Sequence, residues 1–172
     1  MKKILSFVAD LYDERELFYP AIRLKEEGYE VVFAGPEAEE YKGKTGMKQK
    51  ADIAFRDIQA EDYDGLLIPG GYSPDKVRVH EEALEALRAI NEAGKPIGII
   101  CHAGWVAASA GILEGRKMTS VRNIKDDLIH AGAEWVDEAP VVDGNLITAR
   151  NPDDLHSYVK AFIEVLKKEV KL

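Results

Sequence analysis

The 172-residue chain predicts an α/β fold with a mostly parallel sheet and helices on both faces. Short apolar runs typical of buried strands alternate along the chain with longer segments of helical periodicity. Unusual polar or glycine-rich stretches directly follow three of those runs. Hydrophobic residues make up 46% of the chain, which is enough for one buried core. We therefore expect a single domain over residues 1–172.

The first part of the chain predicts two strands around a helix. Residues 3–9, KILSFVA, form the first apolar run. Leucine and alanine recur at helical spacing over residues 17–24, and Gly28 ends that helix. The second strand, YEVVFAG, covers residues 29–35. Residues 35–57 are polar and dotted with glycine, which predicts an excursion with one or two short antiparallel strands.

The middle of the chain repeats the pattern. Residues 64–71, DGLLIPGG, predict a strand that ends in a tight turn. Leu84, Leu87 and Ile90 share one face of a helix, which Gly94 stops. KPIGII then returns as another strand and leads directly into the single cysteine of the chain.

The last part of the chain predicts the remaining strands and a final helix. We expect RKMTSV, residues 116–121, to join the central sheet, and a helix to form over residues 126–131. The pair APVVDG, residues 139–144, and NLITAR, residues 145–150, complete the sheet. Apolar residues then share one face of a helix over residues 155–166, and the preceding NPDD supplies its capping residues.

Composition excludes several classes of partner. The formal charge is −8 and no basic face is apparent, so we expect no nucleic-acid partner. No apolar run approaches the roughly 20 residues that span a bilayer, so we expect no membrane association. The apolar start of the chain is too short for a signal peptide, and one cysteine cannot form an internal disulfide. These features predict a reducing, cytoplasmic location.

Cofactor and metal patterns are also missing from the sequence. Neither C-x-x-C nor H-E-x-x-H occurs, and the four histidines lack metal-ligand spacing. The PGGYSPD segment lacks the P-loop lysine and the G-x-G-x-x-G pattern of nucleotide sites. The sequence therefore predicts no metal and no cofactor.

Cys101 lies where the KPIGII strand turns into a helical segment. Such a turn often requires strained backbone angles and lifts the side chain above the sheet, as in a nucleophile elbow. The amino end of the helix would favour a thiolate, so we predict a reactive Cys101, with a buried structural cysteine as the alternative. The backbone N–H groups of His102 and Gly71 are candidate oxyanion donors. The His102 imidazole is either structural or, if the turn is bent, a partner of the thiol.

Four acidic residues follow the first strand, in ADLYDERE. Capping of the next helix explains Asp10, Asp13 and Glu14. Glu16 is the exception. From there a protonated carboxyl would donate a hydrogen bond to the sulfur of Cys101.

Several sequence blocks, in order, resemble the PfpI family of intracellular cysteine proteases and amidases. They are ELFYP, LIPGGYSPDKVR, ICHAGW, GRKMTS, IKDDLIHAGAEWVD and VVDGNLITARNPDDL. The superfamily includes the parkinsonism-associated protein deglycase, and the resemblance covers essentially the whole chain. It implies a flavodoxin-like three-layer sandwich, similar to the class I glutamine amidotransferase domains. Those domains need a later H-x-E for their triad, which this chain lacks.

The resemblance also implies site residues and an assembly. Cys101 would be the nucleophile, with His102 beside it, Glu16 as the acidic partner, and the amides of Gly71 and His102 as the oxyanion pocket. In the hexameric proteases a carboxylate just after PGG reaches the histidine of a neighbouring subunit, and Asp75 holds that position here. We therefore expect a homo-oligomer, either a dimer or a hexamer.

This chain departs from the family pattern at three places. The usual CHGP is CHAG with Trp105 next, so the start of the helix carries Ala103 and a bulky indole near the pocket. Val121 replaces an aromatic residue after TS, and Asp75 is one methylene shorter than the usual glutamate. These changes predict a different substrate pocket around the same cysteine.

Three functions are compatible with the sequence. The leading one is a cysteine hydrolase acting on peptides or on small carbonyl or glycated compounds, with protease, deglycase or glyoxalase-like chemistry. The second is a redox sensor or a stress-protective, chaperone-like protein in which Glu16 stabilises an oxidised Cys101. The third is a structural oligomer with a vestigial site.

Overall fold

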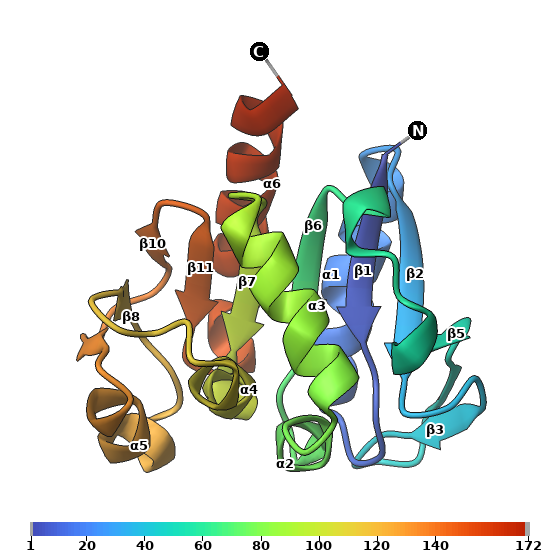
Figure 1. The fold of residues 1–172 in the computed structure, drawn as a ribbon, viewed down its shortest axis with the longest axis horizontal. Coiled ribbons are helices and arrows are strands. Elements are labelled where there is room, and N and C mark those ends of the chain that lie inside the picture. Colours follow the sequence, from blue (N-terminus) through green and yellow to red (C-terminus); the bar gives the residue numbers. More distant parts are fainter. Residues whose placement is uncertain (1, 171–172) are drawn as a thin grey trace.

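A seven-stranded sheet forms the centre of the computed structural model, which describes residues 2–170 (Figure 1). Across the sheet the strands are β10 (Val141–Asp143), β11 (Leu146–Ala149), β7 (Ile97–Ile100), β6 (Gly65–Ile68), β1 (Lys3–Phe7), β2 (Glu30–Gly35) and β5 (Ile53–Ala54). All neighbours are parallel except the β10–β11 hairpin. The order of β2, β1, β6, β7 and β11 is that of flavodoxin-like folds, so the predicted fold class is confirmed.

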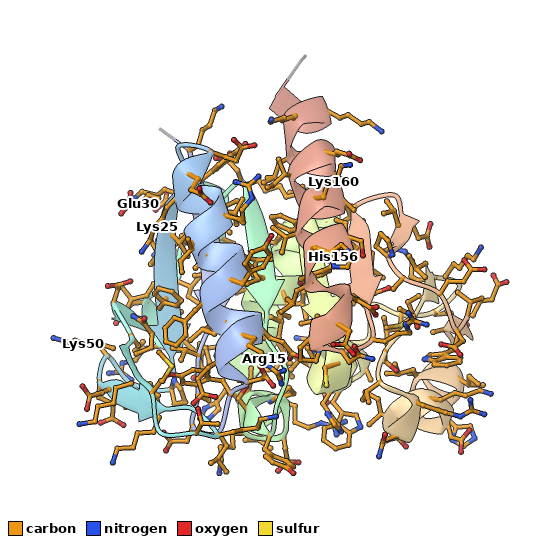
Figure 2. The ribbon with its side chains drawn as sticks, turned by 180° about the vertical axis from the view of Figure 1, so that it is seen from behind. Arg15, Lys25, Glu30, Lys50, His156 and Lys160 are labelled. Atoms are coloured by element: carbon orange, nitrogen blue, oxygen red, sulfur yellow. The ribbon has the colours of Figure 1, made fainter. Side chains whose placement is uncertain are left out.

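Helices cover both faces of this sheet. In Figure 1, α3 (Glu81–Glu92) and α4 (Gly104–Ala110) lie in front of the strands. Figure 2, seen from behind, shows α1 (Glu14–Glu26) and α6 (Leu155–Val170) on the opposite face. Two hydrophobic cores result, one beneath each helical layer. On β6, Leu66 packs into the α3 and α4 core, and Leu67 into the α1 and α6 core, because successive side chains of a strand point to opposite faces.

Shorter elements lie around this framework. They are α2 (Ser73–Val77), α5 (Lys125–His130), and the single-turn helices η1 (Phe55–Asp57), η2 (Ala60–Asp62), η3 (Cys101–Ala103), η4 (Arg122–Ile124) and η5 (Pro152–Asp154). The predicted excursion contains the antiparallel strands β3 (Glu40–Lys42) and β4 (Lys48–Lys50). None of the helices described within residues 2–170 is both long and apolar enough to cross a membrane.

The expectation that residues 116–121 join the central sheet is wrong. Their strand, β8 (Lys117–Met118), pairs instead with β9 (Glu134–Trp135) in a separate parallel ribbon. Side chains of the β10–β11 hairpin accept hydrogen bonds from the backbone amides of this segment. Lys117 N donates to Asp143 Oδ2 at 2.9 Å. Thr119 N likewise donates to Thr148 Oγ1 at 2.9 Å. The segment therefore lies beside the sheet without joining its ladder.

The carboxyl ends of β1, β6 and β7 meet at one edge, where the strand order reverses between β1 and β6. Ligands of open α/β sheets bind at such a switch point. The loops after β1 and β6 are joined directly, since Asp13 N donates to Gly70 O at 3.2 Å and Tyr72 N donates to Leu11 O at 2.8 Å. The three stretches singled out in the sequence therefore converge, as predicted.

Candidate active site

Cys101 occupies a strained turn directly after β7. Its φ is 61°, in the left-handed region that residues other than glycine rarely adopt. Among residues 2–170, Leu11, with φ 68° in the loop after β1, is the one other non-glycine residue in that region. The turn places the side chain between strand and helix, at the carboxyl edge of the sheet. The predicted elbow is therefore present.

Three nitrogen atoms surround the sulfur of Cys101. Against the raising effect of burial, the backbone N–H groups of Gly71 and His102 both lower the pKa of this thiol. The imidazole Nδ1 of His102 lies 3.3 Å from the sulfur. Side chains of adjacent residues usually diverge, and here the positive φ of Cys101 bends the chain enough for them to meet. The structure thus brings together the candidate nucleophile, the imidazole and both candidate oxyanion donors.

Glu16 reaches the same point from the first turn of α1. Its side chain is buried, and Oε1 accepts a hydrogen bond from Gly70 N at 2.8 Å. A Cβ at Gly70 would lie 2.5 Å from that oxygen and 2.7 Å from the Cys101 Cβ, so glycine is required where the two side chains approach.

The second carboxyl oxygen, Glu16 Oε2, is buried without a hydrogen-bond partner in the part of the chain that the structure describes. The expected hydrogen bond from Glu16 to the sulfur is therefore not formed. The carboxyl is instead held by the Gly70 amide through its other oxygen, Oε1.

The charges of this pair differ from the sequence expectation. Burial, together with the charge of Asp13, raises the pKa of Glu16 to about 8, so the carboxyl is protonated at neutral pH. Burial and a charged Glu16 raise the pKa of the Cys101 thiol to about 12, against the lowering effect of the Gly71 and His102 amides. This direction is opposite to the lowered thiol pKa expected from the sequence, which did not show that the Cys101 side chain is half-buried.

His102 is held in a neutral, aromatic environment. Burial, and to a lesser degree the charge of Lys44, lowers its pKa. The Trp105 ring lies against the imidazole, with centroids 5.3 Å apart and planes tilted by 54°. Trp105 is itself anchored, because its Nε1 donates to Asp127 Oδ2 at 2.8 Å and the Arg78 guanidinium lies 5.4 Å from its ring centroid. A neutral imidazole beside a thiol is suited to accept its proton.

Comparison with known proteins identifies the family of this chain. Residues 2–165 match the model of the DJ-1/PfpI family. The chain belongs to this family. It is 44% identical over 165 residues to the deglycase PfpI of Pyrococcus furiosus, covering 96% of this chain and 99% of that protein.

Two further relatives of the DJ-1/PfpI chain extend the comparison. YraA of Bacillus subtilis, whose name provisionally describes a cysteine protease, is 41% identical over 167 residues, with 96% of this chain and 99% of YraA covered. The crystal structure of Drosophila melanogaster DJ-1beta superposes with a TM-score of 0.88 at 29% identity, over 98% of this chain and 92% of that one. The prediction of a cysteine-dependent hydrolase of the PfpI type is confirmed, with its exact reaction open.

Two of the places where this DJ-1/PfpI chain departs from the family pattern lie close to the cysteine. Trp105 contacts the imidazole, as described above. The Val121 amide donates to the Cys101 carbonyl at 3.3 Å, so the loop with valine in place of an aromatic residue is tied to the nucleophile.

Asp75 lies apart from the sulfur in the single chain. It is exposed in the first turn of α2, and no hydrogen bond within residues 2–170 joins it to His102. The helix begins after Tyr72 without any side-chain capping hydrogen bond, so Asp75 does not cap it. An exposed carboxylate remains available to another chain.

Sequence reasoning missed a charged cluster beside the site. Asp13 caps α1 and also binds Arg15 and Lys44, the latter from the β3–β4 turn. Nothing in the sequence pairs residue 44 with residue 13. In the described range 2–170, no group of three or more metal-binding side chains comes together.

Proposed function

We propose that the chain is a cysteine-dependent hydrolase that attacks small electrophilic carbonyl groups, including those of glycated amino acids. The observation that carries this proposal is the convergence of two backbone amides and the His102 imidazole on the Cys101 sulfur. This arrangement supplies a nucleophile, a base and oxyanion donors from the two loops that follow β6 and β7.

The first step follows from these contacts. His102 Nδ1 takes the thiol proton while a sulfur electron pair forms a bond to the carbonyl carbon. The π electrons of the carbonyl move to its oxygen, and the amides of Gly71 and His102 stabilise that oxyanion. The raised resting pKa of Cys101 means that the proton leaves only as the carbon–sulfur bond forms.

The second step returns the proton. Where the attacked carbon bears an amine, the imidazolium of His102 donates the proton to the nitrogen as the carbon–nitrogen bond breaks; the oxyanion re-forms the carbonyl as a thioester, and water hydrolyses it to the acid and the free thiol. Where no group departs, the imidazolium protonates the oxyanion to give a hemithioacetal. With a dicarbonyl such as methylglyoxal, His102 then moves a proton from that carbon to the neighbouring carbonyl carbon, which gives a thioester that water hydrolyses to a hydroxy acid. Glu16, protonated at neutral pH, keeps a second negative charge away from the oxyanion.

Asp75 completes the site in a homo-oligomer, either a dimer or a hexamer. An imidazole that moves a proton needs an orienting acid, and Glu16 is held by Gly70. Asp75 is exposed and lies on the same edge of the sheet, so a neighbouring chain can present it to His102. We place this single-domain enzyme in the reducing cytoplasm, because its one cysteine has no partner for a disulfide.

Peroxide sensing is the second candidate, favoured by the buried, unpartnered Oε2 of Glu16. A protonated Oε2 would donate to an oxygen added to the sulfur, which peroxide supplies as it is reduced to water. The Glu16→Gln variant retains a hydrogen-bond donor at this position, so it should still stabilise the oxidised sulfur. Mass spectrometry after mild peroxide treatment tests this: sulfinate at Cys101 is expected, and an unmodified thiol would exclude it.

An assay of the purified protein with methylglyoxal, a glycated amino acid and a fluorogenic peptide tests the enzyme. We expect loss of the dicarbonyl or release of the free amine, and no activity in the Cys101→Ser variant. Equal activity in that variant, or no turnover of any of the three substrates by the wild type, contradicts the proposal.

A further inference from the structure

Two basic side chains share one buried carboxylate in the loop after β1, next to the cysteine site. Arg15 Nη2 lies 3.1 Å and Lys44 Nζ 3.0 Å from Asp13 Oδ2. Asp13 is buried, whereas the side chains of Arg15 and Lys44 are 67% and 35% exposed. The cluster therefore presents excess positive charge to solvent on a chain whose formal charge is −8.

The backbone of Lys44 is held in place by hydrogen bonds of its turn, in addition to the ion pair of its side chain. Its backbone N donates to Tyr12 O at 2.9 Å, and Gly43 N donates to Met47 O at 2.8 Å. The next residue, Thr45, donates both its backbone N–H and its hydroxyl to Glu14 Oε2, at 2.8 and 2.7 Å. The turn is thus clamped to the loop after β1, and the ammonium is positioned without help from a ligand.

The Lys44 ammonium group can donate hydrogen bonds to a further partner. It has three N–H donors, and Asp13 is its one ion-pair partner among residues 2–170. The pair lies next to the reacting groups, because Asp13 N donates to Gly70 O at 3.2 Å and an added Cβ at Gly70 would lie 2.7 Å from the Cys101 Cβ. Burial first, and then the charge of Lys44, lowers the pKa of His102.

The other nearby acids do not cancel this charge toward the sulfur. Glu14 is directed to the hairpin, where it accepts hydrogen bonds from Thr45 and Met47. Asp10 accepts from Lys42 N at 3.0 Å on the exposed side of the same hairpin. Glu16 is protonated at neutral pH.

We propose that Lys44 binds the carboxylate of an anionic carbonyl substrate and so directs its electrophilic carbon to Cys101. The proposal rests on the function above and narrows it to carbonyl compounds that also carry a carboxylate, such as 2-oxo acids or glycated amino acids. The bond is a charge-assisted hydrogen bond from Nζ to a carboxylate oxygen.

Paired alkylating reagents test the proposal without relying on turnover. Iodoacetate and iodoacetamide are nearly equal in size and differ in charge; with both, the sulfur forms a bond to carbon and iodide leaves. The measured quantity is the ratio of their second-order rate constants at Cys101. In Lys44→Met we expect this ratio, iodoacetate over iodoacetamide, to fall roughly fivefold. In Lys44→Arg it should stay within about twofold of the wild-type value.

Two controls separate local binding from general charge. Lys50→Met removes the same charge from the outer edge of the hairpin, where Figure 2 shows Lys50 pointing away from the molecule, and should leave the ratio unchanged. In the double variant Asp13→Asn with Lys44→Met, the ratio stays low if Lys44 binds the carboxylate. If Lys44 serves only to neutralise Asp13, the double variant recovers the wild-type ratio, which overturns the proposal. An unchanged ratio in Lys44→Met, or an equal fall in Lys50→Met, also overturns it.

Turnover gives a second measurement. With glyoxylate and methylglyoxal as anionic and neutral substrates, Lys44→Met should raise KM severalfold for glyoxylate alone. A parallel rise for both substrates counts against a carboxylate site. If neither substrate is turned over by the wild type, the proposed function fails, and the alkylation ratio still decides whether Lys44 attracts carboxylates.

Discussion

Glu16 and Cys101 approach each other across the backbone of Gly70, and neither leaves room for a methyl group there. An added Cβ would lie 2.5 Å from Glu16 Oε1 and 2.7 Å from the Cys101 Cβ. The Gly70 amide in turn donates to Glu16. This one glycine therefore determines how a buried acid stands beside the nucleophile.

The Gly70→Ala substitution should displace both side chains. We expect a loss of roughly 1–3 kcal/mol in the free energy of unfolding, the usual cost of overpacking, and a fall in activity of at least tenfold. Gly65→Ala, at the other end of β6 with contacts of 3.1 to 3.2 Å, is the matched control. It should destabilise the fold and leave the alkylation rate of Cys101 unchanged. Equal loss of reactivity in both variants would show that Gly70 acts only through stability.

The stability of the protein should fall as pH rises from about 5 to 8. The unfolded Glu16 carboxyl titrates near its ordinary value of 4.5 and the folded one at about 8, so the folded state retains a proton that the unfolded state has lost. The slope contributed by Glu16 is up to roughly 1.4 kcal/mol per pH unit. Urea denaturation across this range measures it.

Glu16→Gln should remove this part of the slope, because the amide is neutral at every pH. Glu85→Gln, at an exposed position of α3, is the control and should leave the slope unchanged. A wild-type slope in Glu16→Gln would mean that the folded carboxyl is already ionised at neutral pH.

Alkylation of Cys101 by iodoacetamide should increase with pH beyond the free-cysteine pKa of about 8.5, with no plateau at neutral pH. Burial raises the thiol pKa, and ionisation of Glu16 adds a second negative charge nearby. Glu16→Gln should therefore shift the midpoint of the rate profile to lower pH. Stopped-flow alkylation followed by mass spectrometry measures both profiles. A wild-type plateau below pH 7 would support the lowered pKa that the sequence suggested.

A shared active site can be tested by mixing two inactive variants. Cys101→Ser lacks the nucleophile and Asp75→Ala lacks the exposed acid. Dissociated and randomly reassembled in equal amounts, they should regain about a quarter of wild-type activity if the acid acts in trans. Each mixed interface that pairs an intact Cys101 with an intact Asp75 is competent. Lys76→Ala, which changes the neighbouring exposed position of α2, serves as the control and should remain active by itself. Inactive mixtures in verified mixed oligomers, or a fully active monomer, would exclude a shared site.

Local patterns in the sequence determined the strands, the helices and the edge at which the site lies. Apolar runs such as KPIGII and the helical spacing of Leu84, Leu87 and Ile90 predict elements correctly because each depends on residues close together in the chain. The position of Cys101 at a strand end, with glycines nearby, likewise predicted the elbow. Local patterns failed for β8, whose place depends on side chains from β10 and β11.

The tertiary structure alone decided how the site residues meet and which charges they carry. Lys44 lies beside Asp13 because a hairpin turn is clamped onto a loop some 30 residues earlier, and no sequence period encodes that contact. Whether Cys101 and Glu16 gain or lose protons depends on how many apolar atoms surround them, which only the folded packing of α1, β6 and β7 determines. Burial opposes charge more strongly than one helix end or two amides favour it, so the thiol pKa rises where the sequence predicted that it would fall.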